Sequence, residues 1–435
     1  MWDKAVAYCR QAGEKAMASW SARREALGYF EQALGVLEHL PETRDTREQA
    51  IDLRLALRSA NIPPSGDPRR VLVYLREAEA LAAALDDPRR LGRVSAFLVN
   101  YCCLMGVPDQ AIAAGQRALA LATASGDIAL QALAHYYLGF TYWLQGAYQR
   151  AIDCLQQTVA SLDGERRRER CGLPVLPVAT ARAMLAICYA ELGRFTEGIA
   201  YGEEGRWIAE AIDHAHPGSL MVASWGGGLL ALRQGDLPRA LPQLERAVSI
   251  CQEVGFPAWF LCLAPALGAA YTLSGRVADA VPLLTQALEL AIATEIAGFQ
   301  ALCSLALGEA QLLADRLDEA QALAEQVLAL TRAHQERGHE TYALHLLGDI
   351  AARREPPERE EAEARYQQAL ALADELGMRP LQAHCHRGLG TLYAATGQRE
   401  QARTALSTAI AMYRAMEMTF WLPQTEASLV QVKGH

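Results

Sequence analysis

The sequence predicts an all-α fold, a solenoid of about ten antiparallel helix pairs with a period near 40 residues. Two observations lead to this prediction. The 435 residues are rich in Ala, Leu, Glu, Gln and Arg and poor in aromatic residues, a composition that favours helices. One pattern of about 25 residues also recurs along the chain, which is the signature of a repeat architecture.

The repeated pattern is a Leu-Gly pair, a large residue three positions later, a second Gly and then regularly spaced small residues. It reads LGFTYWLQGAYQRAIDCLQQTVASL at 138–162, LGAAYTLSGRVADAVPLLTQALELA at 267–291 and LGTLYAATGQREQARTALSTAIAMY at 389–413. Its first small residue falls at Gly139, Ala186, Gly228, Gly268, Gly308, Gly348 and Gly390, with spacings of 47, 42, 40, 40, 40 and 42.

Each copy has the features of two helices joined by a turn. In the copy at 267–291, Leu267, Gly268 and Tyr271 follow helical spacing, and Gly275 stands where a helix needs a left-handed end residue. A mid-helix Gly costs about 1 kcal/mol relative to Ala. Because most copies keep it, we expect the two helices to cross closely at Gly268 and Ala280.

The copies divide the chain into segments. Residues 1–126 hold degenerate N-terminal helix pairs (3–40, 46–85 and 87–125), 127–163 form a complete repeat, and 164–178 form an Arg-rich linker expected to be solvated. Residues 179–418 form the main array, in which Pro356 and Pro357 must end a helix. Residues 419–435 are a predicted capping helix and tail, with Phe420 and Trp421 covering the last repeat.

Composition and motifs argue against several functional classes. The formal net charge of −9 does not suit a nucleic-acid binder, and no Gly-rich phosphate loop is present. The uncharged run 254–275 is diluted by Pro and Gly, so we interpret it as a buried helix and expect no membrane contact. The ten Cys lie scattered in apolar stretches, as expected of reduced thiols in the cytoplasm.

No residue set indicates an enzyme. The pairs His214/His216 and His384/His386 are spaced two apart, and residues two apart on a helix do not face one another. No combination of Ser, His and Asp rises above chance. We therefore expect no catalytic residue, no cofactor and no metal site.

The pattern resembles the tetratricopeptide repeat, whose first helix carries large-x₂-Leu-Gly-x₂-Tyr and whose second carries Ala-x₃-Phe-x₂-Ala. The resemblance covers essentially the whole chain and is strongest over 127–414. It implies a right-handed superhelix whose concave face is lined by the first helix of each pair. A protein or peptide partner would then contact the residues at fixed offsets from the first Gly, which include Tyr136, Phe140, Trp143, Trp225, Leu229, Glu309, Tyr342, His345, Asp349, Arg353, His384, Arg387 and Thr391.

This implied groove is aromatic in its N-terminal half and polar in its C-terminal half. One interpretation is that Trp143 and Trp225 are exposed and bind a partner. The alternative is that the superhelix closes tightly and both side chains pack between repeats. The sequence leaves the two alternatives open.

A narrower resemblance concerns segments such as AVAYCRQAGEKAMA (5–18), RGHETYALHLLGDIA (337–351) and AMEMTFWLP (415–423). They look like the C-terminal tetratricopeptide region of bacterial signalling proteins that carry a class III adenylate/guanylate cyclase domain and a P-loop ATPase. The resemblance implies a non-catalytic sensor and scaffold, part of a longer protein, whose partners include its own upstream ATPase and cyclase domains. The alternative is a free-standing peptide receptor or adaptor.

Overall fold

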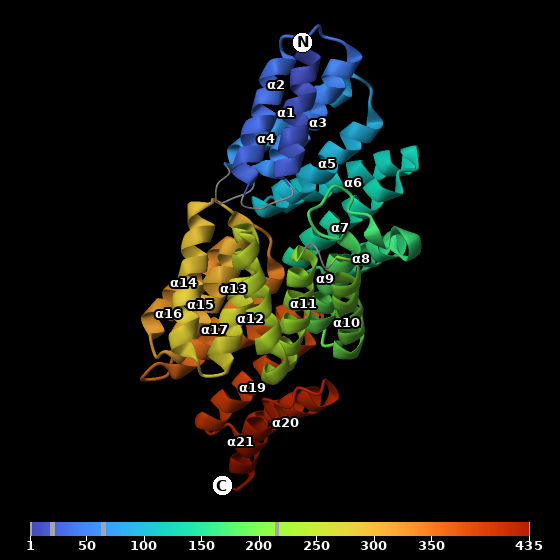
Figure 1. The fold of residues 1–435 in the computed structure, drawn as a ribbon. Helices are drawn as coiled ribbons and strands as arrows, with labels where there is room; N and C mark the ends of the chain where they lie inside the picture. The colour runs from blue at the N-terminus through green and yellow to red at the C-terminus, as the bar shows by residue number, and fades with distance from the viewer. Residues whose placement is uncertain (1, 18–21, 62–66, 214–216, 435) are drawn as a thin grey trace.

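The computed structural model describes residues 2–17, 22–61, 67–213 and 217–434. Within these ranges the chain forms 21 α-helices and one 3₁₀ helix, and no strand (Figure 1). The predicted all-α solenoid is confirmed. His214 and His216 lie outside the described residues.

The helices form ten antiparallel pairs, followed by α21, across the described ranges. In order the pairs are α1 (Trp2–Ala16) and α2 (Arg23–Leu37), α3 (Arg44–Ala60) and α4 (Pro68–Ala84), α5 (Pro88–Leu104) and α6 (Pro108–Ser125), α7 (Ile128–Leu144) and α8 (Tyr148–Leu162), α9 (Pro177–Glu191) and α10 (Phe195–Ile212), α11 (Gly218–Gln234) and α12 (Leu237–Val254), α13 (Pro257–Leu273) and α14 (Val277–Ala293), α15 (Ala297–Leu313) and α16 (Leu317–Ala333), α17 (Arg337–Arg353) and α18 (Arg359–Leu376), and α19 (Arg379–Ala395) and α20 (Arg399–Ala415). The last helix is α21 (Leu422–Gly434).

The turn between the two helices of a pair takes the conformation that its residues suggest. Gly275 and Gly397 have φ values of 79° and 77°, in the left-handed region that Gly adopts without a steric penalty. In the copy where Asp315 replaces this Gly, the Asp has a φ of 59°. Asp tolerates this conformation better than most residues, so the turn survives the replacement.

The Gly inside the first helix marks a close helix crossing, as predicted. A Cβ atom placed on Gly268 would lie 2.5 Å from the side chain of Leu284 on the second helix of the same pair. At Gly390 the corresponding distance to Leu406 is 2.7 Å. Real Cβ contacts are not this short, so the helices could not approach as closely with a larger residue there.

Two irregular segments interrupt the stack. Helix α17 ends at Arg353 and α18 begins at Arg359, so Pro356 and Pro357 do separate two helices. The Arg-rich segment contains the 3₁₀ helix η1 (Gly164–Arg168), and α9 begins at Pro177, inside the stretch 164–178 that was expected to be linker. Arg170 of this segment pairs with the buried carboxylate of Asp213 rather than standing in solvent.

Pairs that are five apart in the sequence also touch. Contacts join α5 to α15, α7 to α17 and α9 to α19. The turn residue Gly146 lies so close to α17 that an added Cβ would be 2.6 Å from the backbone N of Gly338. In the same way Gly193, in the turn after α9, lies against Met416, which follows α20. Successive superhelical turns are therefore in contact, and the inner face is closed along much of its length.

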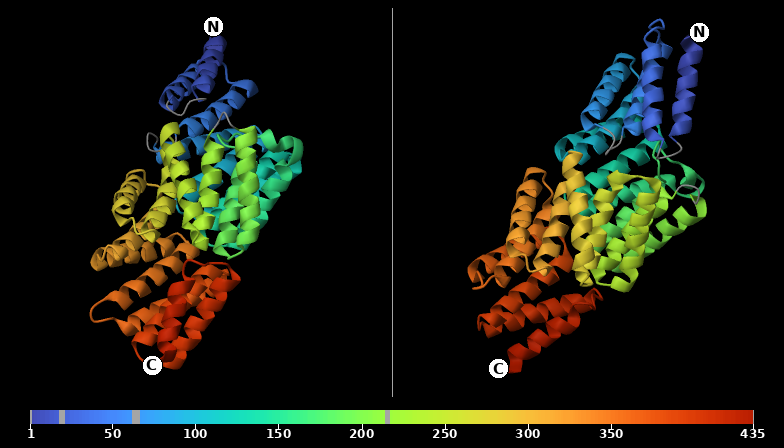
Figure 2. Two further views of the ribbon diagram at one scale, coloured as in Figure 1. Left: turned by 60° about the horizontal axis from the view of Figure 1, so that its bottom comes forward. Right: turned by 60° about the vertical axis from the view of Figure 1, so that its left-hand side comes forward.

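The two ends of the chain lie at opposite ends of an elongated molecule (Figure 2). The main hydrophobic cluster extends from α3 to α19, whereas Val6, Phe30, Leu53 and Leu57 belong to a separate cluster in α1–α4. The first pair therefore packs only in the N-terminal cluster, whereas the second pair contributes to both clusters and joins the N-terminal end to the rest of the solenoid.

Candidate functional site

The first helices of the pairs, from α5 to α19, form the inner face of the superhelix. Trp143 from α7 and Trp225 from α11 meet edge to face, with ring centroids 5.9 Å apart. Their exposed fractions are 5% and 1%. The alternative that the sequence left open is thereby decided, because both side chains pack inside the closed superhelix.

The aromatic half of the inner face joins distant pairs. Phe140 lies 6.3 Å from Phe299 of α15, between ring centroids, and Trp143 lies 6.2 Å from His339 of α17. Trp225 contacts Trp259 at 6.1 Å. These T-shaped contacts are a favourable geometry for aromatic pairs. The contacts of Phe140 and Trp143 join successive superhelical turns, and that of Trp225 joins neighbouring pairs.

The polar half begins with an ion pair between a buried Glu and a half-buried Arg. Glu191 at the end of α9 accepts hydrogen bonds from Arg233 Nε at 2.8 Å and from Tyr342 OH at 2.7 Å. The Arg233 guanidinium also lies over the Tyr342 ring, 4.6 Å from its centroid. Burial, followed by the charge of Arg233 acting in the opposite direction, leaves the pKa of Tyr342 well above its ordinary value. Tyr342 therefore acts as a neutral hydrogen-bond donor.

Glu309 faces a cavity of about 40 Å³ that it shares with Arg233, Leu229 and Trp225. The Trp225 indole Nε1 is buried and has no hydrogen-bond partner in this structure. Burial raises the pKa of Glu309 to about 7, with Arg233 lowering it and Asp349 raising it. A cavity of this size is large enough to hold a water molecule.

Ionisable side chains continue along α17 and α19. His345 Nδ1 lies 3.5 Å from Asp349 Oδ2, and the other Asp349 oxygen accepts a hydrogen bond of 2.6 Å from Tyr366. His384 Nδ1 lies 2.7 Å from the hydroxyl of Tyr413. Burial lowers the pKa of His384 well below its ordinary value, and the positive charges around it add to this effect. His384 is therefore neutral near pH 7.

The remaining predicted residues lie nearer the surface. Arg353 donates a hydrogen bond of 2.9 Å to the carbonyl of Leu312, and Thr391 is exposed and donates to the carbonyl of Arg387 at 2.9 Å. Among the described ion pairs, none includes Arg353 or Arg387. This end of the inner face therefore presents guanidinium groups that have no carboxylate partner within the described ranges.

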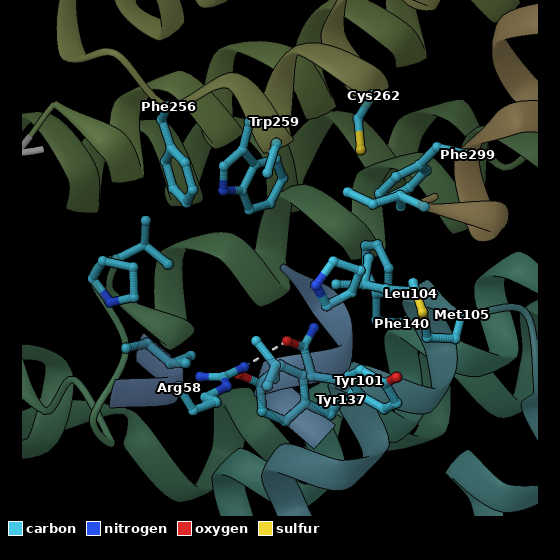
Figure 3. Close-up of a pocket in the computed structure, with 18 of the residues that line it drawn as sticks. Arg58, Tyr101, Leu104, Met105, Tyr137, Phe140, Phe256, Trp259, Cys262 and Phe299 are labelled. Carbon is cyan, nitrogen blue, oxygen red and sulfur yellow. Dashed lines mark hydrogen bonds between the residues drawn. The ribbon is translucent and has the colours of Figure 1, made fainter. Parts of the chain in front are cut away.

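A larger cavity of about 180 Å³ lies between two walls (Figure 3). Phe256, Trp259, Cys262 and Phe299 form one wall, and Arg58, Tyr101, Leu104, Met105, Tyr137 and Phe140 face them from α3, α5 and α7. The Arg58 guanidinium donates a hydrogen bond of 2.6 Å to Asn100 Oδ1. The Arg-rich segment also contributes to the lining, through Leu173 and Val175.

Sequence reasoning missed several inner-face residues. Trp259, Phe299 and His339 each stand nine positions before the first Gly of their copies, at Gly268, Gly308 and Gly348. The prediction used positions from six before that Gly to four after it. These helices begin 11 residues before the Gly, so they carry one more inward position near the start. The 40-residue period was the signal that could have revealed it.

Comparison with known families agrees with the repeat pattern. A tetratricopeptide-repeat model matches residues 93–163 and 342–415, and a second one matches 266–296. The chain contains tetratricopeptide repeats. The first match includes α5 and α6, where the sequence pattern alone had faded. No curated protein sequence matches this chain.

One solved structure shares the fold at low sequence identity, and others show a weaker similarity. A Rap protein complexed with competence and sporulation factor is 16% identical over 86% of this chain and 99% of that chain, with a TM-score of 0.60. A signal transduction ATPase with a tetratricopeptide repeat sensor from Pyrococcus horikoshii is 14% identical over 93% of this chain and 56% of its own length, with a TM-score of 0.48. Aspartyl phosphate phosphatase F from Bacillus subtilis is 12% identical over 86% and 94%, with a TM-score of 0.48.

No described helix has the length and apolar character needed to cross a bilayer, including α13 within the uncharged run 254–275. No group of three or more His, Cys, Asp or Glu in the described ranges could hold a metal ion.

Proposed function

We propose that this chain is a non-catalytic scaffold that binds a protein or peptide partner and serves as the sensor region of a larger bacterial signalling protein linked to a cyclase or an ATPase. The observation that supports it most directly is the contact between pairs five apart. A partner that touches two superhelical turns would change how they sit against each other. The effect would then reach helices far from the contact.

The partner site that we propose is the open polar end of the inner face. Arg353 and Thr391 are its exposed members and Arg387 is half-buried, while Trp143 and Trp225 support the walls from inside. The two guanidinium groups lack carboxylate partners in the described part of the chain. Arg pairs with carboxylates through two parallel hydrogen bonds, so an acidic segment is the complementary partner.

Binding can be tested with a positional-scanning library of fluorescent nonapeptides and fluorescence anisotropy. We expect acidic peptides to be selected and the Arg387→Gln variant to bind them at least tenfold more weakly. Arg403→Gln is the matched control, since Arg403 lies on α20 and pairs with Glu400 on the exposed surface. Equal binding by both variants would place the partner elsewhere.

The regulatory part of the proposal needs a separate measurement. The selected peptide is added to the full-length protein that carries the upstream domains, and nucleotide turnover is recorded. If the peptide binds but nucleotide turnover does not change, the proposed sensor role is wrong and only the proposed scaffold role remains.

A free-standing receptor or adaptor is the second candidate. It is favoured by the fold match to the Rap protein, which extends over 99% of that chain and was obtained in complex with a competence and sporulation factor. The reading frame upstream of Met1 distinguishes the two candidates. A P-loop ATPase encoded in the same frame would exclude the free-standing form.

A further inference from the structure

The cavity of about 180 Å³ between α5, α7, α13 and α15 has a lining that the proposed partner site does not explain. Its lining is apolar and aromatic, apart from a few polar groups near α3 and α5. Arg58 is the single Arg, Lys, Asp or Glu among the described residues that line it. An apolar cavity with one positive charge is complementary to an apolar molecule with one negative charge.

Arg58 is not neutralised by the protein. No ion pair joins Arg58 to a carboxylate within the described ranges. It donates to Asn100 Oδ1 and its guanidinium lies 4.3 Å from the centroid of the Phe97 ring. Asp67 is nearby in the chain but caps α4 by accepting from the backbone N of Arg69 at 2.8 Å.

The positive charge extends beyond Arg58. Arg23 donates to the carbonyl of Ser59 at 2.5 Å, and its guanidinium lies 5.8 Å from the centroid of the Phe256 ring, which lines the cavity. Burial, with a further contribution from the charge of Arg58, lowers the pKa of Arg23 to about 9. A second guanidinium group therefore contacts the wall of the cavity, at the Phe256 ring.

The other polar groups of the lining include hydrogen-bond donors. Because Asn100 Oδ1 accepts from Arg58, the Asn100 amide group is oriented as a donor, and no hydrogen bond from Nδ2 occurs among the described residues. Trp259 Nε1 likewise makes no described hydrogen bond, and this side chain is half-buried. The donors would be satisfied by a ligand with acceptor atoms.

The size of the cavity limits the apolar part of the ligand. Pockets that enclose drug-sized molecules usually measure about 300–1,000 Å³, so a cavity of about 180 Å³ suits a smaller group. A planar carboxylate matches the fork of the Arg58 guanidinium and can pair with it through two parallel hydrogen bonds. Apolar cavities of similar size bind small apolar molecules readily.

We propose that this cavity binds a small amphipathic carboxylic acid, with the carboxylate on Arg58 and Asn100 and the hydrocarbon part between Phe140, Trp259 and Phe299. The site is separate from the open polar end, so it does not depend on the proposed partner. The acid would bridge α7 to α13 and α15, and it would therefore stabilise the contact between superhelical turns.

The test uses the whole chain and sodium salts of straight-chain acids from hexanoate to dodecanoate. Isothermal titration calorimetry should show binding that tightens about fourfold for each added methylene, since a buried methylene contributes about 0.8 kcal/mol. The gain should stop once the cavity is full. Decanol and decylamine are compared with decanoate, and both should bind at least tenfold more weakly.

Variants locate the carboxylate. Arg58→Gln should weaken decanoate binding at least tenfold and leave decanol unchanged, whereas Arg58→Lys should weaken it by about threefold, because the charge remains and the paired geometry is lost. Arg54→Gln is the matched control one helical turn earlier, since Arg54 pairs with Glu77 at 2.7 Å. This control should change binding less than twofold.

Cys262→Phe locates the hydrocarbon part, because Cys262 points into the cavity (Figure 3). Its larger side chain should abolish binding of every acid. If this variant does not fold, the plateau of the chain-length series still measures the cavity. Equal binding of decanol and decanoate, an unchanged affinity in Arg58→Gln, or binding of apolar peptides but of no free acid would each overturn the proposal.

Discussion

The two halves of the inner face fill the space inside the superhelix with different kinds of side chain. In the aromatic half, Trp143, Trp225 and Trp259 fill the space between superhelical turns with rings in edge-to-face contact. In the polar half, Glu191, Arg233 and other ionisable groups fill the equivalent space. An aromatic contact loses little when the environment changes, whereas a buried charge depends on its partner and on pH.

This difference suggests a division of roles. The aromatic half buries large apolar rings, and burial of apolar area is the dominant favourable term in folding. The polar half costs desolvation free energy, which its hydrogen bonds must offset. The aromatic half should therefore set the stability of the solenoid, and the polar half should make that stability responsive to pH.

The largest effect should follow removal of an aromatic ring. Trp225→Ala should lower the free energy of unfolding by about 3–5 kcal/mol, the usual cost of emptying a buried aromatic site. Urea denaturation followed by circular dichroism measures it. Trp207→Ala is the control, because Trp207 on α10 is 55% exposed, and it should change stability by less than about 0.5 kcal/mol. Similar effects of the two changes would contradict the packing role of Trp225.

Next in size is the loss of the ion pair in the polar half. Glu191→Leu leaves Arg233 and the Tyr342 hydroxyl without their acceptor, and should cost about 3 kcal/mol. Glu197→Leu removes a comparable pair with Arg194 at 2.9 Å, but on the surface, and should cost less than about 1 kcal/mol. If both variants unfold at the same urea concentration, the polar half does not hold the superhelical turns.

A third prediction concerns the contact between superhelical turns at Gly146 and Gly338. Gly146→Ala should cost about 2–3 kcal/mol, because its Cβ would lie 2.6 Å from the backbone of Gly338 and the left-handed φ adds strain. Gly275 has a similar φ but no atom within 4 Å of an added Cβ, so Gly275→Ala should cost only about 1 kcal/mol. Thermal melts of the two variants make the comparison. If both variants lose the same free energy of unfolding, the contact between Gly146 and Gly338 can open without loss of stability.

The smallest effect is the pH dependence from Glu309. Its pKa is raised to about 7 in the folded chain from an ordinary 4.5, so the folded state binds a proton more tightly than the unfolded state. Stability from this group is full below about pH 4.5 and is lost as pH rises through about 7.

Glu309→Gln removes this dependence. The variant should match the wild type at pH 5 and exceed it by about 1–2 kcal/mol at pH 8, since one pKa unit corresponds to about 1.4 kcal/mol and partial solvent exposure reduces it. Denaturation at both pH values measures the difference. Glu319→Gln on the exposed face of α16 should show no such change. Parallel pH curves for wild type and Glu309→Gln would contradict the assignment.

The helix pairs and their crossings could be predicted from the sequence because they depend on residues close together in the chain. Gly268 and Leu284 are 16 positions apart, and their contact repeats in other copies such as Gly390 with Leu406. The position of Trp143 on the inner face followed from the same local register. The family offsets could not reach Trp259 or Phe299, because they were defined for shorter helices.

The sequence by itself determined the fold class, the order of the helix pairs and the inward position of residues such as Trp143, since 3.6-residue periodicity and turn Gly residues are local signals. Only the tertiary structure decided how tightly the superhelix closes. That depends on small rotations between pairs that add up over five repeats, until α7 meets α17 and Gly146 meets Gly338. The same accumulated rotation places Arg58 opposite Trp259. The cavity between them therefore cannot be recognised from the sequence of any single repeat.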